Sequence, residues 1–131
     1  MAIKQIFSKK GFTLAEVIVV AAVIAVLAAV VVVSYISVSD KAQKNLCIAN
    51  QRMIHGAALT HLSVSDPKTF IKKSDKARLN ELVKQGFIKN RKVLKCPSST
   101  TQDYNDYTIV FEGDKIIDVE CKVKPAEHKW P

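Results

Sequence analysis

An unbroken apolar segment lies near the N-terminus of this 131-residue chain. Every residue from 17 to 33 is Val, Ile, Ala or Leu, and the wider segment 12–33 carries one charged side chain, Glu16. At about 1.5 Å per residue, a helix over this wider segment measures roughly 33 Å, which is close to the thickness of a bilayer's hydrocarbon core. The segment therefore predicts a membrane-spanning helix.

The flanks of this segment predict its orientation. Residues 1–11 are short, polar and basic, and lysines precede the apolar run, so the positive-inside rule places the N-terminus in the cytoplasm and exports the C-terminal part. A cleaved secretory signal peptide is the alternative, because the Ala-rich stretch 25–29 offers small residues to a peptidase. The length of the apolar run, the carboxylate at its start and the lack of a helix breaker argue against it.

The net charge of +8 and the pI of about 9.5 raise the question of nucleic-acid binding. Three of the lysines precede the apolar run, and their removal with residues 1–11 lowers the net charge to about +5. The remaining lysines are scattered, without a basic helix or a stripe of aromatic and basic residues. We therefore predict no dedicated nucleic-acid site.

After Ser34 the sequence becomes amphipathic, and one helix is expected to continue to about Leu62. Small and apolar residues recur at intervals of three and four, which predicts a buried face made of Leu46, Ala49, Met53 and either Gly56 or Ala57. A second, short helix is expected after Ser74, a suitable N-cap, with an apolar face and a stop at its end. Its face comprises Leu79, Leu82 and Val83, and its stop is Gly86 with Phe87 as a hydrophobic latch.

The last third of the chain predicts an antiparallel hairpin. Residues 107–111 and 116–123 form two β-like runs, and residues 112–115 between them supply positive φ at Gly113 or Asp114. The expected fold is α+β, with a long N-terminal helix packed on a short helix and a small antiparallel sheet. Its expected parts are an N-terminal segment (1–11), a transmembrane helix (12–33), its amphipathic continuation (34–64) and a small globular domain (65–131).

The junction in front of the apolar run carries a specific motif. The chain reads Lys9-Lys10-Gly11-Phe12-Thr13-Leu14-Ala15-Glu16 there. With the apolar helix after it, this octapeptide resembles the processing signal of type IV pilins and of the pseudopilins of type II secretion and competence systems. The C-terminal half is similar, more loosely, to the small cysteine-bearing domain of some bacterial pilin-like proteins, through residues 82–88, Cys96-Pro97, Tyr107, Cys121 and His128.

The resemblance implies a pathway for the chain. Prepilin peptidase is expected to cut between Gly11 and Phe12 on the cytoplasmic side and to methylate Phe12, which makes Glu16 the fifth residue of the mature chain. Many members carry a glycine and a proline within the apolar helix, where this chain has Ala25 and Val33. Nothing local therefore breaks the helix here.

Glu16 is expected to act in assembly. A carboxylate at the start of an apolar helix is costly in lipid unless it finds a partner, and cleavage creates a cation at Phe12. When staggered helices pack, Glu16 of one subunit neutralises Phe12 of its neighbour and sets the register, with Thr13 beside them. The alternative is a helix-start acid that only complements the helix dipole.

The three cysteines contain no CxxC pair, which leaves no zinc or redox signature. Cys96 and Cys121 bracket the predicted hairpin in an exported domain, so we expect a disulfide between them, worth around 3.5 kcal/mol by the chain-entropy estimate. Cys47 is then the odd cysteine, either a buried helical thiol or a partner in an intersubunit disulfide.

The histidines are not expected to act as metal ligands. We expect His55 and His61 on the surface of the long helix and His128 near a mobile end of the chain.

No metal, cofactor or catalytic residue is predicted. Four aspartates of the C-terminal part are expected in turns or on the surface, and not in a calcium site, because they lack a compact ligand spacing. They are Asp103, Asp106, Asp114 and Asp118. No nucleophile and base pattern, paired carboxylates or Gly-rich phosphate loop stands out, so the chain is not expected to be an enzyme.

The expected function is that of a structural subunit of a type IV pilus or pseudopilus. Its expected partners are copies of itself, prepilin peptidase and the pilus or secretion machinery of the cytoplasmic membrane. It would span that membrane once before assembly and then form an extracytoplasmic or cell-surface filament. The alternative is a single-pass anchored binding domain that does not polymerise, for which the helix is only a tether.

Overall fold

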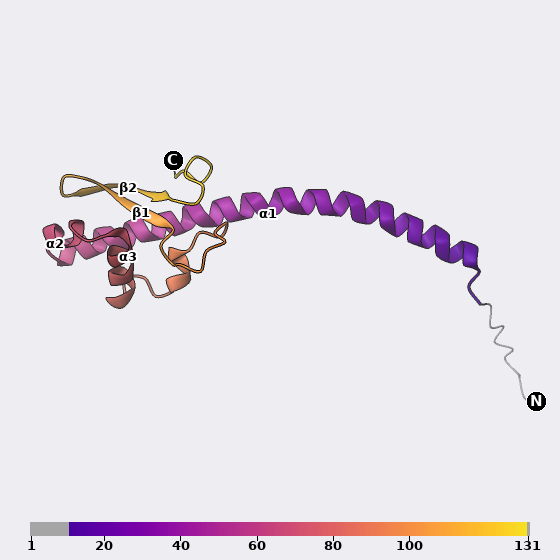
Figure 1. The fold of residues 1–131 in the computed structure, drawn as a ribbon, viewed down its shortest axis with the longest axis horizontal. Helices are drawn as coiled ribbons and strands as arrows, with labels where there is room; N and C mark the ends of the chain where they lie inside the picture. Colours follow the sequence, from indigo (N-terminus) through magenta and orange to yellow (C-terminus); the bar gives the residue numbers. More distant parts are fainter. Residues whose placement is uncertain (1–10, 131) are drawn as a thin grey trace, which may run out of the picture. The chain divides into compact units, whose positions relative to one another are not determined.

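The computed structural model describes residues 11–130 and confirms the α+β fold. Its elements, in chain order, are α1 (Leu14–Val64), α2 (Pro67–Ile71), α3 (Asp75–Lys84), the 3-10 helix η1 (Arg91–Leu94), β1 (Tyr107–Glu112) and β2 (Lys115–Cys121) (Figure 1). The chain forms two compact units, one up to Val38 and one from Ser39.

The first unit consists of the N-terminal part of α1. The helix is continuous through Ala25 and Val33, where many pilins carry glycine and proline. From residue 11 to residue 38, every side chain that the structure describes is exposed. The most apolar 18-residue window of α1 has a mean hydropathy of 3.3 and none of it is buried, so this helix is long and apolar enough to cross a membrane.

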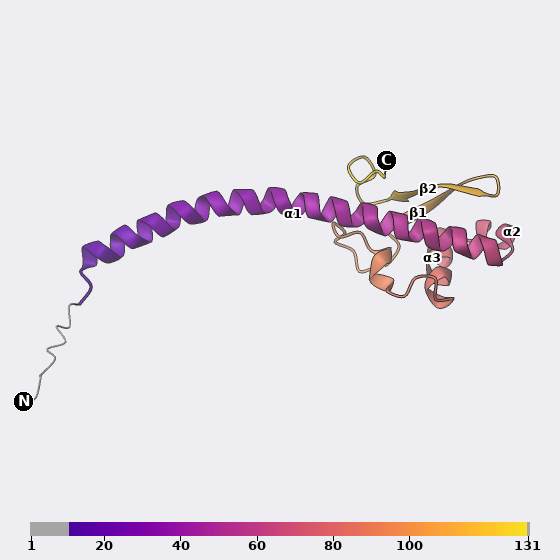
Figure 2. The same cartoon turned by 180° about the vertical axis from the view of Figure 1, so that it is seen from behind.

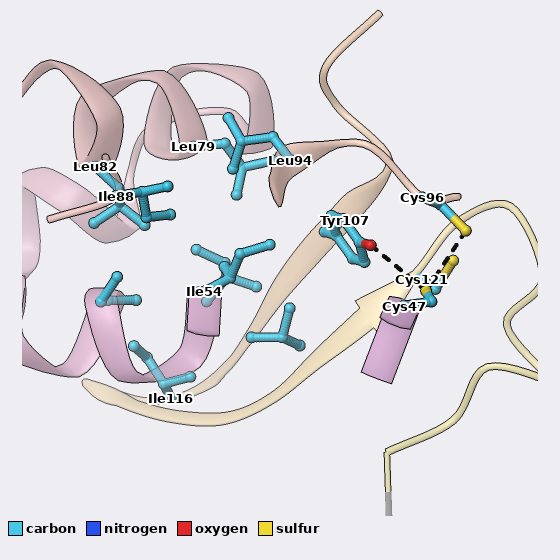
Figure 3. Close-up of a cluster of buried hydrophobic side chains, with 14 of the residues drawn as sticks. Cys47, Ile54, Leu79, Leu82, Ile88, Leu94, Cys96, Tyr107, Ile116 and Cys121 are labelled. Atoms are coloured by element: carbon cyan, nitrogen blue, oxygen red, sulfur yellow. Dashed lines mark hydrogen bonds between the residues drawn. The ribbon is translucent and has the colours of Figure 1, made fainter. Parts of the chain in front are cut away.

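The second unit is built around the C-terminal part of α1, along which the hairpin and α3 lie (Figure 2). Its buried apolar cluster joins Ile54 of α1, Leu79 and Leu82 of α3, and Ile109 and Val119 of the sheet. Figure 3 shows part of this cluster, with side chains from all these elements pointing towards one another. One small core therefore holds the second unit together.

The buried face of α1 in this unit differs from the predicted face. Leu46 and Met53 are 54% and 52% exposed, and Ala49 is exposed as well. The buried face lies about one residue further round the helix, shares Ala57 with the prediction, and comprises Cys47, Asn50, Gln51, Ile54, Ala57, Ala58 and His61. An apolarity pattern misses most of this face because three of its residues are polar, and two of them, Asn50 and Gln51, donate hydrogen bonds inside the unit.

The short helix and its ends agree with the prediction. The hydroxyl of Ser74 caps α3 by accepting a hydrogen bond from the backbone N–H of Ala77 at 3.4 Å. Leu79 and Leu82 are buried on the inner face. Gly86, at φ +82°, ends the helix in the left-handed region, and Phe87 packs against the core as the expected latch. The structure also contains α2 and η1, which the sequence patterns do not predict.

The hairpin is confirmed, and a bulge adjusts its register. Gly113 supplies the positive φ, 61°, at the first position of a two-residue turn. Val110 pairs with Asp118 and Phe111 with Ile116, so Ile117 has no partner across the ladder. The extra residue reverses the alternation of β2, which allows Ile116 to face the core on the same side as Val119.

The bulged register predicts that two neighbouring isoleucines contribute unequally to stability. Ile116→Ala should lower the free energy of unfolding of the second unit by about 2 to 4 kcal/mol, because it removes a buried side chain that is 8% exposed. Ile117→Ala is the matched control, since Ile117 is 54% exposed, and should change stability by less than about 1 kcal/mol. Urea unfolding of the full chain in detergent, followed by Trp130 fluorescence, measures both; equal losses would contradict the bulged register.

Candidate processing and assembly site

The predicted processing junction lies immediately before α1. Gly11, Phe12 and Thr13 are outside regular secondary structure, and all three are exposed. The space around Gly11 is open, with nothing within 4 Å of the position that a Cβ would take, and Phe12 is 84% exposed. Lys9 and Lys10 of the predicted signal lie outside the described residues. Within the described part of the chain, the junction is accessible to a peptidase.

Thr13 and Glu16 form a reciprocal cap on α1. The Glu16 Oε2 atom accepts hydrogen bonds from the backbone N–H of Thr13 at 2.8 Å and from its hydroxyl at 2.9 Å. The Thr13 hydroxyl oxygen accepts in turn from the backbone N–H of Glu16 at 3.3 Å. This is a capping box, in which an N-cap Thr and a Glu three residues later satisfy unpaired donors at the helix start. The sequence shows the Thr-x-x-Glu spacing, but the resemblance to pilins points only to the assembly role of both residues.

An apolar stripe begins beside this cap. The stripe is one shallow surface at the start of α1, lined by Phe12, Glu16, Val17, Val20, Ala21 and Ile24. Their spacing of three to four residues places them on one face of the helix. Glu16 therefore stands at the N-terminal end of a face that is otherwise apolar and uncovered. Both hydrogen bonds from Thr13 use Oε2, so Oε1 stays free of these contacts.

The three cysteines are free thiols, and the predicted disulfide between Cys96 and Cys121 is not formed. The sulfur of Cys96 lies 3.5 Å from that of Cys47 and 3.4 Å from the Nδ1 atom of His128. The sulfur of Cys121 lies 3.9 Å from the same Nδ1 atom. A pairing inferred from the hairpin alone overlooks α1 and the C-terminal segment, which bring a third thiol and an imidazole to the same point.

The environment of this cluster is apolar and closed. The three thiols and His128 are each at most 2% exposed. Burial raises the pKa of the Cys47 thiol and of the Cys96 thiol and lowers the pKa of the His128 imidazole. Burial likewise raises the pKa of Tyr107, whose hydroxyl donates to the Cys47 sulfur at 3.5 Å. Without a bound cation, the environment favours the neutral forms of these two thiols, the imidazole and the phenol.

The other histidines differ from the prediction of surface positions. His61 is buried, with its ring centroid 4.4 Å from that of Phe70 and 5.5 Å from that of Phe87. Its Nε2 atom lies 3.6 Å from a carboxylate oxygen of Glu81. His55 is half-buried against the Trp130 ring. The surface prediction is therefore wrong for His61, and His128, expected near a mobile end, is buried in the cysteine cluster.

The four aspartates do not gather into a ligand set within residues 11–130. Asp106 is buried and accepts the backbone N–H of Cys96 at 2.9 Å, which positions that cysteine. Asp118 accepts from the backbone N–H of Val119, and Asp114 lies in the hairpin turn. In this part of the chain, the one group of three or more potential metal ligands is the cluster of three cysteines and His128.

Comparison with known protein families gives one match, to the prokaryotic N-terminal methylation motif, over residues 6–32. The matched segment contains the processing junction, the capping box and the whole apolar stripe. The chain carries the prepilin-type signal of the type IV pilin and pseudopilin family. Neither the curated proteins nor the solved structures gave a match to the chain.

A prepilin-type signal implies a type IV pilin-like protein that prepilin peptidase processes. Such proteins are typically structural and not enzymatic. Together with the apolar helix, the signal indicates anchoring in the cytoplasmic membrane, followed by an extracytoplasmic location. The predicted prepilin-type signal is thereby confirmed from the residues that suggested it.

The capping box of this pilin-like chain can be tested at Thr13. Thr13→Val keeps the shape of the side chain but removes the hydroxyl, so the first turn of α1 should lose about 1 kcal/mol of local stability. Amide hydrogen exchange of residues 14–17, measured on the full chain in micelles, should speed up roughly fivefold. Thr13→Ser retains the hydroxyl and should exchange like the wild type; unchanged exchange in the valine variant would rule out the cap.

Proposed function

We propose that this chain is a structural subunit of a type IV pilus or pseudopilus. The observation that carries the proposal is a prepilin-type signal joined directly to an apolar helix whose described side chains are all exposed over residues 11–38. A helix with this surface needs either lipid or other apolar helices around it. A filament core made of such helices satisfies the need after the subunit leaves the membrane.

Processing is the first proposed step. Prepilin peptidase hydrolyses the peptide bond between Gly11 and Phe12, which leaves a carboxylate on the leader and a new amine on Phe12. The open space at Gly11 and the irregular backbone of residues 11–13 support this position, because a peptidase needs an extended, accessible bond. Methylation of the amine keeps its positive charge, so Phe12 still brings a cation to the end of the apolar stripe.

Assembly is the second proposed step. The Phe12 ammonium of an incoming subunit pairs with Glu16 of a subunit already in place, while the apolar stripes of their α1 helices pack together. Glu16 stands at the head of the stripe with its Oε1 atom outside the capping box. A buried charge without a partner costs several kcal/mol, so a wrong stagger between helices is strongly disfavoured. Thr13 holds the carboxylate near the position where the neighbour's amine arrives.

The proposed partners follow from these steps. The chain contacts copies of itself through residues 12–33, prepilin peptidase through residues around Gly11, and the membrane-embedded assembly machinery of a pilus or secretion system. The second unit, with its own core, faces the exterior of the filament. A surface pilus and a pseudopilus both fit this scheme.

The mature N-terminus tests the processing step. Mass spectrometry of the native protein should find a chain that begins at Phe12 and carries a methyl group on its amine. The measurement uses membranes or sheared filaments from cells that contain prepilin peptidase. A chain that begins at Met1, or beyond the apolar run as an ordinary secreted protein would, contradicts the proposal.

Two variants of Glu16 separate its two roles. Glu16→Gln keeps a side-chain oxygen that can complete the capping box but cannot neutralise an amine. Glu16→Ala removes both functions. If the register depends on charge, both variants should give at least tenfold fewer filaments, with normal amounts of membrane-inserted precursor.

Electron microscopy and quantitative blotting of sheared filaments provide the measurement, with Thr13→Val as the variant that weakens the cap but keeps the carboxylate. Wild-type numbers of filaments built wholly from Glu16→Gln subunits would show that the cap, and not the charge, is what matters. A chain that is processed yet never forms filaments would instead support the membrane-anchored binding domain.

A further inference from the structure

We propose that Cys47, Cys96, Cys121 and His128 bind one zinc ion as a structural site. The four residues come from different parts of the second unit: α1, the loop after η1, the last residue of β2 and the C-terminal segment. Their potential ligand atoms all lie within 4.8 Å of one another. Figure 3 shows Cys47, Cys96 and Cys121 side by side at one end of the buried cluster.

The distances fit tetrahedral coordination. Zinc bonds of about 2.3 Å to sulfur and about 2.0 Å to nitrogen place neighbouring ligand atoms roughly 3.5 to 3.8 Å apart at the tetrahedral angle. The sulfurs of Cys47 and Cys96 are 3.5 Å apart, and His128 Nδ1 lies 3.4 Å from Cys96 and 3.9 Å from Cys121. The 3.5 Å between the Cys47 and Cys96 sulfurs is well beyond the roughly 2.05 Å sulfur–sulfur bond of a disulfide. These three separations match those of ligands around a central ion, and the remaining ones stay within 4.8 Å.

Hydrogen bonds around the cluster hold the ligands in place. The Tyr107 hydroxyl donates to the Cys47 sulfur at 3.5 Å, and the Gln51 side-chain amide lies 3.8 Å from the same sulfur. The Gln51 amide also donates to the backbone carbonyl of His128 at 2.6 Å, which fixes the C-terminal segment. Asp106 fixes the backbone of Cys96. Such surrounding contacts orient the ligands of metal sites and stabilise negative charge on sulfur.

The chemistry of the donor set favours zinc and a structural role. Three thiolates and one imidazole form a common set for structural zinc, whereas magnesium and calcium prefer oxygen ligands. Four protein ligands complete the tetrahedron and leave no open position for a substrate. A single disulfide would use two of the three thiols and leave the third buried beside it. One zinc ion engages all three thiols and the imidazole.

Zinc would tie together segments that share little regular structure. The loop after η1 and the segment after β2 carry no helix or strand, and the sheet has only two strands in the described part of the chain. A bound ion joins both segments to α1, and its binding free energy adds directly to folding. This role replaces the disulfide predicted from the sequence. It does not rest on the proposed filament function, since the site lies wholly in the second unit.

Metal content of the full-length chain tests the proposal. The chain is extracted from membranes in mild detergent, without chelator or reductant, and its zinc is measured by elemental mass spectrometry. We expect about one zinc per chain. Thiol alkylation followed by mass spectrometry should find all three cysteines protected in the native chain and reactive after denaturation with a chelator and no reductant.

Variants of the proposed ligands test whether the zinc ion is bound at this cluster. Cys121→Ser and His128→Gln should each reduce retained zinc at least tenfold after dialysis against a weak chelator. His55→Gln is the matched control, because His55 lies on the same helix as Cys47 but outside the cluster, and it should retain zinc as the wild type does. If a ligand variant fails to fold, cobalt substitution of the wild-type chain still decides, through sulfur-to-cobalt charge-transfer bands and the visible absorption of tetrahedral cobalt.

Several results would overturn the site. They are less than about 0.1 zinc per chain with no tetrahedral cobalt spectrum, a disulfide between any two of the three cysteines in the native protein, or full zinc retention by folded Cys121→Ser and His128→Gln chains. Because zinc is measured on the membrane-extracted chain, these results are independent of whether the protein is cut at Gly11 or forms filaments.

Discussion

The exposed apolar surface of residues 12–33 is the constraint on which the rest of this protein depends. Each Val, Ile or Leu left in water instead of buried costs about 1.5 to 3 kcal/mol, and residues 17–33 consist only of Val, Ile, Ala and Leu. Nothing in the described part of the first unit covers these side chains. The chain therefore needs lipid or neighbouring helices at every stage. In the proposed function, this surface moves from lipid into a filament core, which gives a purpose to the removal of a leader at Gly11 and to the charge at the helix start.

The second unit is subject to a different constraint, because a small domain with long irregular segments must pack against the C-terminal part of one long helix. Three polar residues of α1 are buried, and two of them bind backbone carbonyls far away in sequence. Asn50 donates to the carbonyl of Lys95 at 3.3 Å, and Gln51 donates to that of His128 at 2.6 Å. Buried amides in such positions satisfy loops that have no ladder or helix of their own. The polar residues on the inner face of α1 thus organise the irregular segments, while the apolar residues form the core.

Local signals in the sequence predict much of this fold. The hairpin follows from two β-like runs around Gly113, and α3 follows from Ser74 and Gly86, because turns and caps depend on neighbouring residues. The motif at Gly11 and Phe12 is recognisable for the same reason. The buried face of α1 is misplaced by the apolarity pattern because its polar members find partners that only the tertiary structure reveals.

The cysteine cluster shows the limit of local sequence patterns even more clearly. Cys47 and Cys96 are 49 residues apart, and His128 lies 32 residues beyond Cys96. The spacing of these residues in the sequence therefore does not indicate that they lie together. A search for CxxC pairs finds nothing, and a prediction from the hairpin joins the two cysteines nearest to the strands. What decides the arrangement is the fold, which brings α1 and the C-terminal segment to the end of β2. Such a site becomes visible only when burial and distance are known together.

In the proposed function, Glu16 has one role in the free chain and another in the assembled filament. In the free chain its carboxylate completes a capping box with Thr13, which is worth on the order of 1 kcal/mol. In the proposed filament the same carboxylate meets a buried ammonium, and leaving that ammonium unpaired costs several kcal/mol. Both bonds from Thr13 use Oε2, so Oε1 can pair with the ammonium while Thr13 still holds the carboxylate. The cap need not be lost, because the bond from the backbone N–H of Glu16 to the Thr13 hydroxyl does not use the carboxylate. The first turn of α1 can therefore stay ordered while the Glu16 carboxylate pairs with the Phe12 ammonium of the next subunit. In the proposed filament, the side chain that caps the helix before assembly thus sets the register between subunits after it.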